Sequence, residues 1–413
     1  MAIELTGDEM HHLSQELDPA PARCCVRRST GPPSVSSHVI FEYLNKGAAN
    51  IVFQIHSWTH NGPATKFFFF DVSREGRLSF KATPTDHDYL MRHVLRVPRG
   101  GQKHLSSMEI IHGYENAIRP LFLPGTYKTL GRAKASQNGS DAPLTVHLKK
   151  DLTKHLMDHE GVLLLPEVMS HLYTRVEKGT FTNTASRVCW GILLPNMSPT
   201  PGQSITFEIK PKWLAQSPNA PPGAMRCRNC AMQVSVPKKR DTYICPLQVL
   251  HGNSEALRPW VHTTVMRQFG RDLPSQAVVS TMVEGILNYL TVGDGVELLR
   301  HLLQLQSTLD PRGVLCRPHH GSDLFDYNLR LAMTLRDCSL FIKISYNTRG
   351  MTGIESKLGD LDFKSAEKIV DWTDKERQLL RDDAYLAPNG PPCWIQNVNE
   401  KEMDLPNNKA PDN

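Results

Sequence analysis

Residues 205–213 constrain the fold of this chain more than any other stretch, because they predict a short strand that must stop at a fixed point. β-Branched and aromatic residues favour an extended backbone at the start, and Pro211 cannot donate to a neighbouring strand. Glu208 and Lys210 are two residues apart, so on a strand they project from one face. Lys212 follows a proline that favours an extended chain, so we expect it to reach the same cleft. Two ammonium groups beside one carboxylate suit a polyanionic ligand, although a solvated Lys-Pro-Lys turn explains these residues equally well.

Length and composition indicate a large globular protein. The chain has 413 residues, 40% hydrophobic and 22% charged, which is enough to bury a sizeable core in two or three domains or lobes. No run of eighteen apolar residues occurs, so we expect no membrane segment. The acidic first twenty residues do not resemble a secretory signal, and nine cysteines without a framework spacing fit reduced thiols. We therefore expect a nuclear or cytoplasmic protein.

The charge balance favours a small anionic ligand over a nucleic acid. A formal net charge of +5 is mild, and basic and aromatic residues do not alternate as they do in single-strand binders. We therefore expect no nucleic-acid partner and a monomeric protein. A nucleic-acid-binding protein remains a third interpretation, supported by the mild basicity alone.

A hairpin is predicted near the N-terminus, over residues 38–55. Gly47 and Asn50 are expected to supply permissive backbone positions in its turn, while Ala48 and Ala49 keep the loop narrow. Any hairpin could carry this sequence.

Two further strands are predicted before the organising stretch. Residues 94–97 carry Arg96, for which a surface position is the simplest interpretation. Residues 188–195 form an apolar strand that leaves through a proline.

Helical periodicity is strongest between residues 275 and 305, where Gly293-Asp-Gly295 divides two core helices. Residues 109–118 and 149–159 are shorter helix candidates. The Ala-, Ser- and Gly-rich residues 129–143 indicate a loop or linker.

Carboxylates follow two of the predicted elements. Asp337 lies between a mostly apolar stretch and the strand 340–344, where it is either a capping residue or a catalytic acid. Asp360 and Asp362 would share one face of an extended chain and offer hard oxygen ligands for Mg²⁺. An acidic turn before the helix 365–380 explains the same pair.

Cysteines give a weaker metal signal. Cys227 and Cys230 form a Cys-x-x-Cys pair that could supply half of a zinc site, but no second pair follows and Cys245 stands alone. A loosely spaced complement is Cys316, His319 and His320.

Several of these motifs resemble those of the inositol-pentakisphosphate 2-kinases, which transfer a phosphoryl group from ATP to the 2-hydroxyl of inositol pentakisphosphate. Glu-Ile-Lys-Pro-Lys is similar to the family signature. In the expected order, the chain also carries a Gly-Ala-Ala-Asn loop, Cys-Arg-x-Cys, Asp-Cys-Ser and Asp-Leu-x-x-Lys. The chain thus resembles a divergent, fungal-type member of this family.

The resemblance implies an α+β fold with two lobes, distantly like protein kinases. The expected parts are a weakly structured segment 1–36, an N-lobe 37–198, a C-lobe 199–387 and a disordered tail 388–413.

The resemblance also implies a set of site residues, with ATP, inositol pentakisphosphate and Mg²⁺ as ligands. Asp337 would be the catalytic base, and Asp360 and Asp362 would hold the metal. ATP would be bound by Gly47, Ala48, Ala49, Asn50, Arg96, Asn196, Glu208 and Lys210. Substrate phosphates would be bound by Lys210, Lys212, Arg228, Lys364 and Lys368.

The chain departs from the family pattern at several points. Met232 stands where a histidine is expected, Lys368 where arginine is frequent and Trp372 where a tyrosine is expected. The Asn-Gly turn expected within residues 262–276 is missing from the sequence. These departures keep open an alternative function, that of a catalytically impaired scaffold that binds inositol phosphates.

Overall fold

The computed structural model divides the chain into two compact units, each of which is described by itself. Unit 1 comprises residues 1–116 and 157–196, and unit 2 comprises residues 117–156 and 197–413. Within the part of the chain that the structure describes, no helix has both the length and the apolar content needed to cross a bilayer. The described residues are 23–27, 39–47, 49–57, 67–72, 78–79, 84–99, 105–128, 145–148, 150–174, 176, 189–235, 243–270, 273–318 and 323–396.

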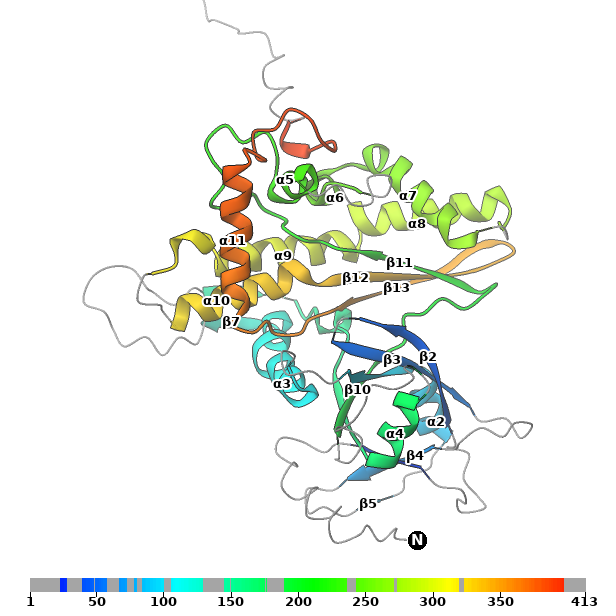
Figure 1. Ribbon diagram of the computed structural model, residues 1–413. Helices are drawn as coiled ribbons and strands as arrows, with labels where there is room; N and C mark the ends of the chain where they lie inside the picture. The colour runs from blue at the N-terminus through cyan, green and yellow to red at the C-terminus, as the bar shows by residue number, and fades with distance from the viewer. Residues whose placement is uncertain are drawn as a thin grey trace, which may run out of the picture. The chain divides into compact units, whose positions relative to one another are not determined.

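Unit 1 is built on one eight-stranded sheet with the order β1-β9-β10-β6-β3-β2-β4-β5 (Figure 1). β1 pairs with β9 in parallel and with β4 in antiparallel fashion, so seven of the strands close into a ring and β5 extends from β4. The strands are β1 (Arg23–Arg27), β2 (Val39–Lys46), β3 (Asn50–Ser57), β4 (Phe67–Val72), β5 (Leu78–Ser79), β6 (His93–Pro98), β9 (Glu160–Leu164) and β10 (Cys189–Pro195).

The core of unit 1 is made by the apolar alternate residues of these strands. Phe53 of β3, Leu95 of β6 and Leu193 of β10 are completely buried in one cluster. Gly191 leaves room for this packing, because a Cβ atom there would lie 2.9 Å from a Leu164 methyl group. The helices of this unit are α2 (Pro84–Met91), α3 (Ser107–Gly113) and α4 (Pro166–Thr174), and a π-helical turn Tyr114–Ile118 continues α3 into unit 2.

Unit 2 contains a three-stranded antiparallel sheet with the order β11-β12-β13. β11 (Ser204–Ile209) pairs with β12 (Ser339–Asn347) from Ser204 opposite Ser345 to Ile209 opposite Leu340. β13 (Gly350–Gly359) completes a hairpin with β12. A separate two-stranded sheet is formed by β7 (Gly125–Lys128) and β8 (Thr145–Leu148). The strand predicted at the start of 205–213 is therefore confirmed, and it stops where Pro211 was expected to end it.

Helices cover the three-stranded sheet, and α8 packs on β12 and β13 (Figure 1). The break predicted at Gly293-Asp-Gly295 is confirmed, because α8 ends at Thr291 and α9 begins at Asp294. Gly295 is required there, since a Cβ atom would lie 2.5 Å from the Tyr289 ring. The helices are α5 (Arg228–Ser235), α6 (Pro246–His251), α7 (Ser254–Phe269), α8 (Gln276–Thr291), α9 (Asp294–Leu309), α10 (Asp323–Asp337) and α11 (Lys368–Arg381), with 3-10 turns at Arg119–Phe122, Thr153–His155 and Val314–Cys316.

The helix predicted over 149–159 is wrong. Only a 3-10 turn forms, and its ends are held by β13: Lys357 donates to the Lys154 carbonyl at 2.8 Å, and Leu156 bridges to Leu358. These tertiary contacts replace the hydrogen bonds that a helix would need.

Two expectations about the ends of the chain also need correction. Residues 23–27, expected to be weakly structured, form β1 between two other strands. Residues 388–396 were expected to be disordered, but they pack against the rest of unit 2. Cys393 is 1% exposed and lies in a core cluster with Cys227 and Cys245. The other residues of 1–36 and 388–413 lie outside the described part of the chain.

Candidate functional site

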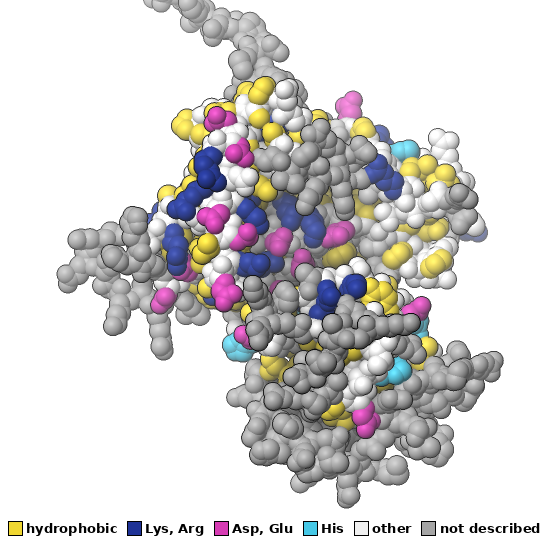
Figure 2. Space-filling model, in the orientation of Figure 1, with side chains coloured by type: hydrophobic (Ala, Val, Ile, Leu, Met, Phe, Trp, Pro, Cys, Tyr) yellow, Lys and Arg dark blue, Asp and Glu magenta, His cyan; other side chains and the backbone are white. Residues whose placement is uncertain are grey.

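A cavity of about 770 Å³ in unit 2 collects most of the predicted substrate residues. Its walls come from the end of β11, the start of α5, the end of α10 and the first turns of α11. Basic and acidic side chains gather on this part of the surface, beside α11 (Figure 2). Five lysines line the cavity against three acids: Lys210, Lys212, Lys364, Lys368 and Lys375, with Glu208, Asp337 and Asp371.

Asp337 is the last residue of α10, and it lies between two lysines. Its two carboxylate oxygens accept from Lys212 and Lys364, each at 2.9 Å, and its side chain is 50% exposed. Burial alone would raise the pKa of Asp337, but the charges and hydrogen bonds of the two lysines lower it to about 2. The carboxylate is thus ionised at any physiological pH.

The position of Asp337 is unfavourable for helix stability. The last turn of a helix carries partial negative charge on its carbonyls, so an acid there is repelled where a base would be attracted. Lys212 and Lys364 offset this repulsion. Capping therefore does not explain an acid at this helix C-terminus, and the carboxylate instead pairs with two lysines of the cavity.

Lys210 is held by three oxygen groups next to Asp337. Its ammonium donates to Glu208 at 2.9 Å and to Ser339 Oγ at 2.6 Å, and it lies 3.8 Å from an Asp360 oxygen. Burial would lower the pKa of Lys210, but the Glu208 hydrogen bond and charge raise it. Glu208 and Lys210 therefore share one side of β11, as the two-residue spacing predicted.

Lys212 lines the cavity as predicted, but its backbone conformation differs from the predicted one. Its φ is 52°, in the left-handed region, where we expected an extended chain. Such a conformation costs a non-glycine residue about 1–3 kcal/mol. Gln306 stabilises it, because its amide nitrogen donates to the Lys212 carbonyl at 2.8 Å and its oxygen accepts from the Leu214 N–H at 2.9 Å.

Asp360 and Asp362 are placed by a turn after β13. Asp360 has φ 57°, so the pair is not on one extended face as predicted. Burial, and secondarily the neighbouring carboxylates of Asp362 and Asp337, raise the pKa of Asp360 despite the opposing charges of Lys364 and Lys210. A half-exposed carboxylate beside another carboxylate is the kind of hard oxygen set that binds Mg²⁺, so these residues fit that ion.

Two arginines lie in the wall of the cavity and are paired behind it. Arg228 Nε donates to Glu376 at 2.7 Å, and Arg336 donates to Asp310 at 2.5 Å. Both guanidinium groups stack on the Trp213 ring, at 4.4 and 3.6 Å from its centre. Arg228, which was predicted to bind a substrate phosphate, thus lines the cavity. Its Nε–H is already hydrogen-bonded to Glu376.

The first turns of α11 present the remaining side chains of the cavity. Lys368 is exposed, and among the residues that the structure describes it has no ion-pair partner. Lys375 pairs with Asp371 at 2.8 Å, and Trp372 packs in a core cluster with Trp213 and Met333. Met232 of α5 also lines the cavity, at the position where the resemblance led us to expect a histidine.

In unit 1, Arg96 and Asn50 form a pair across β3 and β6. With the amide oriented by its hydrogen bonds, the Asn50 oxygen accepts from two Arg96 nitrogens at 2.7 and 3.1 Å. The Gly47 N–H donates to the Asn50 carbonyl at 2.8 Å and closes the turn. The φ of Gly47 is not positive, so this turn does not use the left-handed region that is open to glycine.

The other residues of unit 1 that were predicted to bind ATP are Ala48, Ala49 and Asn196. Ala49 accepts from the Arg99 N–H through its carbonyl, and Ala48 lies outside the described residues. The Asn196 N–H donates to the Arg92 carbonyl at 2.7 Å, so this donor is already used within the protein.

Sequence reasoning missed several residues that hold the site in place. Ser339 bridges Lys210 and Glu208, and the Asp-Cys-Ser motif contained it. Gln306 and Glu376 support Lys212 and Arg228 from distant helices, and no local pattern identifies them. Glu376 is completely buried and also accepts from Ser217 and Tyr385.

A comparison with known protein families places these motifs in one group. Residues 43–378 match the family model described as inositol-pentakisphosphate 2-kinase. The chain belongs to this family. The match includes every predicted site residue, from the Gly47 turn of unit 1 to Lys368 in unit 2.

Two curated relatives from yeasts carry the same name. The inositol-pentakisphosphate 2-kinase of Yarrowia lipolytica is 27% identical over 230 residues, which cover 50% of this chain and 68% of that protein. The inositol-pentakisphosphate 2-kinase of Kluyveromyces lactis is 28% identical over 176 residues, which cover 43% of this chain and 50% of that protein. The similarity to this second member of the family thus spans half of its length.

Proposed function

We propose that this chain transfers the γ-phosphoryl group of ATP to the 2-hydroxyl of inositol 1,3,4,5,6-pentakisphosphate, giving inositol hexakisphosphate and ADP. The observation that carries the proposal is Asp337, an acid held between Lys212 and Lys364 at the mouth of a lysine-lined cavity. Membership of the family supports the reaction class. The fold is then a two-lobed inositol-phosphate kinase fold, distantly like that of protein kinases.

The cavity suits a compact ligand with many phosphates. Lys212 and Lys364 each have one carboxylate partner that a phosphate oxygen can replace, and Lys368 is exposed beside them. Arg228 contributes the edge that Glu376 does not occupy. Ammonium and guanidinium groups bind phosphate oxygens through charge-assisted hydrogen bonds, and several are needed because each phosphate carries up to two charges.

Asp337 orients the attacking hydroxyl. The 2-hydroxyl oxygen forms a bond to the γ-phosphorus while the bond from that phosphorus to the β,γ-bridging oxygen breaks, and ADP leaves. Because the lysines lower the pKa of Asp337 to about 2, its carboxylate accepts a hydrogen bond from the hydroxyl but is a weak base. The hydroxyl proton therefore moves late, after most of the phosphoryl transfer, as in other phosphoryl-transfer enzymes.

Asp360 and Asp362 are assigned to Mg²⁺, and eight residues to ATP. A bound Mg²⁺ neutralises charge on the β- and γ-phosphates. Asp360 lies 3.8 Å from the Lys210 ammonium. A carboxylate that could hold the metal and a cation that could bind phosphate oxygens therefore lie next to each other. The residues assigned to ATP are Gly47, Ala48, Ala49, Asn50, Arg96, Asn196, Glu208 and Lys210. The compartment we propose is the nucleus or the cytoplasm.

The test is a product analysis with matched variants. Purified protein is incubated with Mg²⁺, ATP and inositol 1,3,4,5,6-pentakisphosphate, and the products are resolved by anion-exchange chromatography. Asp337→Asn keeps the shape of the side chain and removes its charge, so turnover should fall by about 10²–10⁴-fold. The control is Asp326→Asn, on the same helix but paired with Arg317 outside the cavity, which should keep the parent rate.

Binding distinguishes loss of chemistry from loss of the site. Asp337→Asn should bind pentakisphosphate at least as tightly as the parent, because a repelling carboxylate is gone. If the parent binds pentakisphosphate tightly but yields no hexakisphosphate, the kinase proposal fails and the scaffold alternative takes its place.

A further inference from the structure

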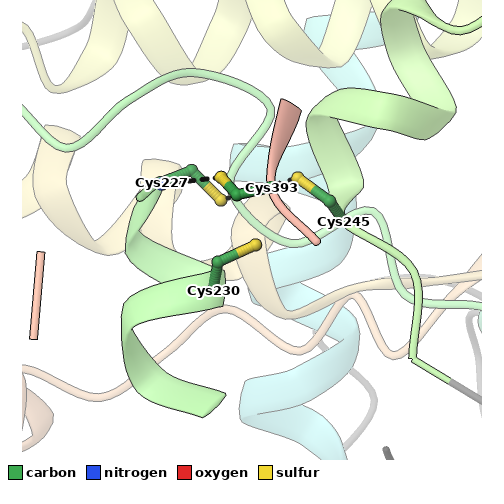
Figure 3. Close-up of side chains that lie close together, drawn as sticks. All are labelled: Cys227, Cys230, Cys245 and Cys393. Atoms are coloured by element: carbon green, nitrogen blue, oxygen red, sulfur yellow. Dashed lines mark hydrogen bonds between the residues drawn. The ribbon is translucent and has the colours of Figure 1, made fainter. Parts of the chain in front are cut away.

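Four cysteines from three separate segments of unit 2 meet in one buried cluster. Cys227 directly precedes α5 and Cys230 lies in its first turn, Cys245 directly precedes α6, and Cys393 comes from the segment after α11. Figure 3 shows their side chains pointing toward one another. Each is at most 1% exposed. Cys245, which stands alone in the sequence, is therefore not isolated in space.

The sulfur positions have the spacing of a tetrahedral metal centre. The four Sγ atoms lie within 4.8 Å of one another, and those of Cys227 and Cys245 are 3.7 Å apart. With Zn–S bonds of about 2.3 Å, tetrahedral coordination separates any two sulfurs by about 3.8 Å. The cluster needs only small side-chain rotations to reach that geometry.

Disulfides do not account for the cluster. None of the four cysteines is bonded to another, and the 3.7 Å separation is nearly twice a disulfide bond of about 2.0 Å. Pairing two of them would leave the other two as buried thiols with no metal and few polar partners. Four converging sulfurs suit a single ion, whereas the cysteines of an iron–sulfur cluster bind separate irons and stand further apart.

The surroundings favour thiolates. Cys227 and Cys230 lie at the N-terminus of α5, where the helix dipole stabilises negative charge. The Cys227 backbone N–H donates to the Cys393 sulfur at 3.2 Å, the type of hydrogen bond that disperses charge from a metal-bound thiolate. Leu247, Trp394 and Tyr243 pack around the cluster and keep water away.

We propose that Cys227, Cys230, Cys245 and Cys393 bind one Zn²⁺ ion as a structural centre of unit 2. Four protein ligands leave no open position, which is typical of a structural and not a catalytic zinc site. Cys393 lies beyond residue 378, where the match to the family model ends. Cys316, the other cysteine we weighed as a ligand, is exposed and takes no part in the cluster, and His319 and His320 lie outside the described residues.

The centre would hold one wall of the cavity. Arg228 lies between Cys227 and Cys230 in the sequence. It lines the cavity together with Asn229 and Met232, which also belong to α5. Fixing α5 to α6 and to the segment at 393 therefore fixes the side of the cavity that carries Arg228.

The first test measures metal without any substrate, so its result does not depend on the proposed kinase activity. The full chain is purified without metal-affinity resin or chelators, and zinc, iron and copper are measured by mass spectrometry of the elements. We expect about one zinc per chain. A mercurial that modifies thiols should release this zinc in proportion to modification of the cluster.

Variants locate the ion. Cys245→Ser and Cys393→Ser should each lose most of the zinc and lower the melting temperature, while Cys316→Ser should keep both at parent values. Replacement of zinc by Co²⁺ in the parent chain should give the intense visible absorption of a tetrahedral thiolate complex. This measurement keeps the proposal testable if a serine variant fails to fold.

Three results on zinc and on the thiols would overturn the proposal. They are a parent chain without zinc even after refolding with Zn²⁺, zinc retained by both Cys245→Ser and Cys393→Ser, and a disulfide among these four cysteines in the non-reduced peptide map. Iron with acid-labile sulfide in place of zinc would also contradict it.

Discussion

The ion pairs at the mouth of the cavity and those behind its wall use similar chemical groups but differ in burial. Lys212 and Asp337 at the mouth are 33% and 50% exposed, whereas Arg336 and Asp310 behind the wall are 3% and 1% exposed. Water and incoming ligands can replace either partner in the first pair. Neither partner in the second pair can be solvated without unfolding.

This difference separates the groups that we propose to bind substrate phosphates from the groups that support the wall of the cavity. A lysine whose partner is half exposed can exchange that carboxylate for a phosphate oxygen at little cost, because both states are solvated. A buried arginine held by an acid and an aromatic ring is fixed in one position. The cavity thus has partly exposed cations at its mouth and a buried wall of Trp213, Arg228 and Arg336.

The largest effect on stability is expected when the buried pair is broken. Arg336→Met leaves Asp310 as a buried charge without a counter-ion, so the free energy of unfolding should fall by about 3–5 kcal/mol. Urea denaturation followed by fluorescence measures this. Adding Asp310→Asn to Arg336→Met should recover part of the loss, and a double variant as unstable as the single one would argue against an electrostatic cause.

A smaller effect, on affinity and not on stability, is expected at the mouth. Lys212→Met removes one ammonium from the proposed phosphate site and should weaken binding of inositol pentakisphosphate by about 10–100-fold, the value of one or two charge-assisted hydrogen bonds. Calorimetry without ATP measures this affinity. Lys150→Met serves as control, since Lys150 pairs with Glu297 away from the cavity. Equal affinities for the two variants would remove Lys212 from the site.

Acid should weaken the ion pairs of Asp337 at the mouth of the cavity. The folded pKa of Asp337 is about 2, below an unfolded value of about 3.9. Its contribution to stability is therefore fully present above the unfolded value and is lost as the pH falls toward 2. The free energy of unfolding of the parent should drop more between pH 5 and pH 3 than that of Asp337→Asn. A constant difference between the two proteins over this range would contradict the lowered pKa.

The smallest effect is expected for an exposed pair outside the cavity. Arg317 donates to Asp326 through two nitrogens, at 2.7 and 2.5 Å, but both residues meet solvent. Arg317→Ala should lower the free energy of unfolding by less than about 1 kcal/mol. A loss as large as that of Arg336→Met would show that burial does not control the strength of these pairs.

The sequence predicted what is encoded locally. The strand before Pro211, the break between α8 and α9 and the closeness of Glu208 to Lys210 all follow from neighbouring residues. The family motifs named Asp337, Lys212 and Lys364, and the structure brings these three together.

What could not be predicted depends on contacts between distant residues. The left-handed backbone at Lys212 is stabilised by Gln306, and the 3-10 turn at Thr153–His155 is held by β13. Cys393 was assigned to a disordered tail because its segment is rich in proline and polar residues. Its partners, Cys227 and Cys245, are visible only when the chain is folded.

The anchoring of residues 387–393 sets an order of events during synthesis. The guanidinium of Arg226 donates to the carbonyls of Ala387, Pro388 and Pro391, and Arg226 is 1% exposed. The ribosome makes these acceptors, and Cys393 after them, long after it has made Arg226. Until they emerge, the Arg226 guanidinium lacks these three acceptors, and the thiols of Cys227, Cys230 and Cys245 lack their fourth partner. Unit 2 therefore completes its folding only after residue 393 has been translated.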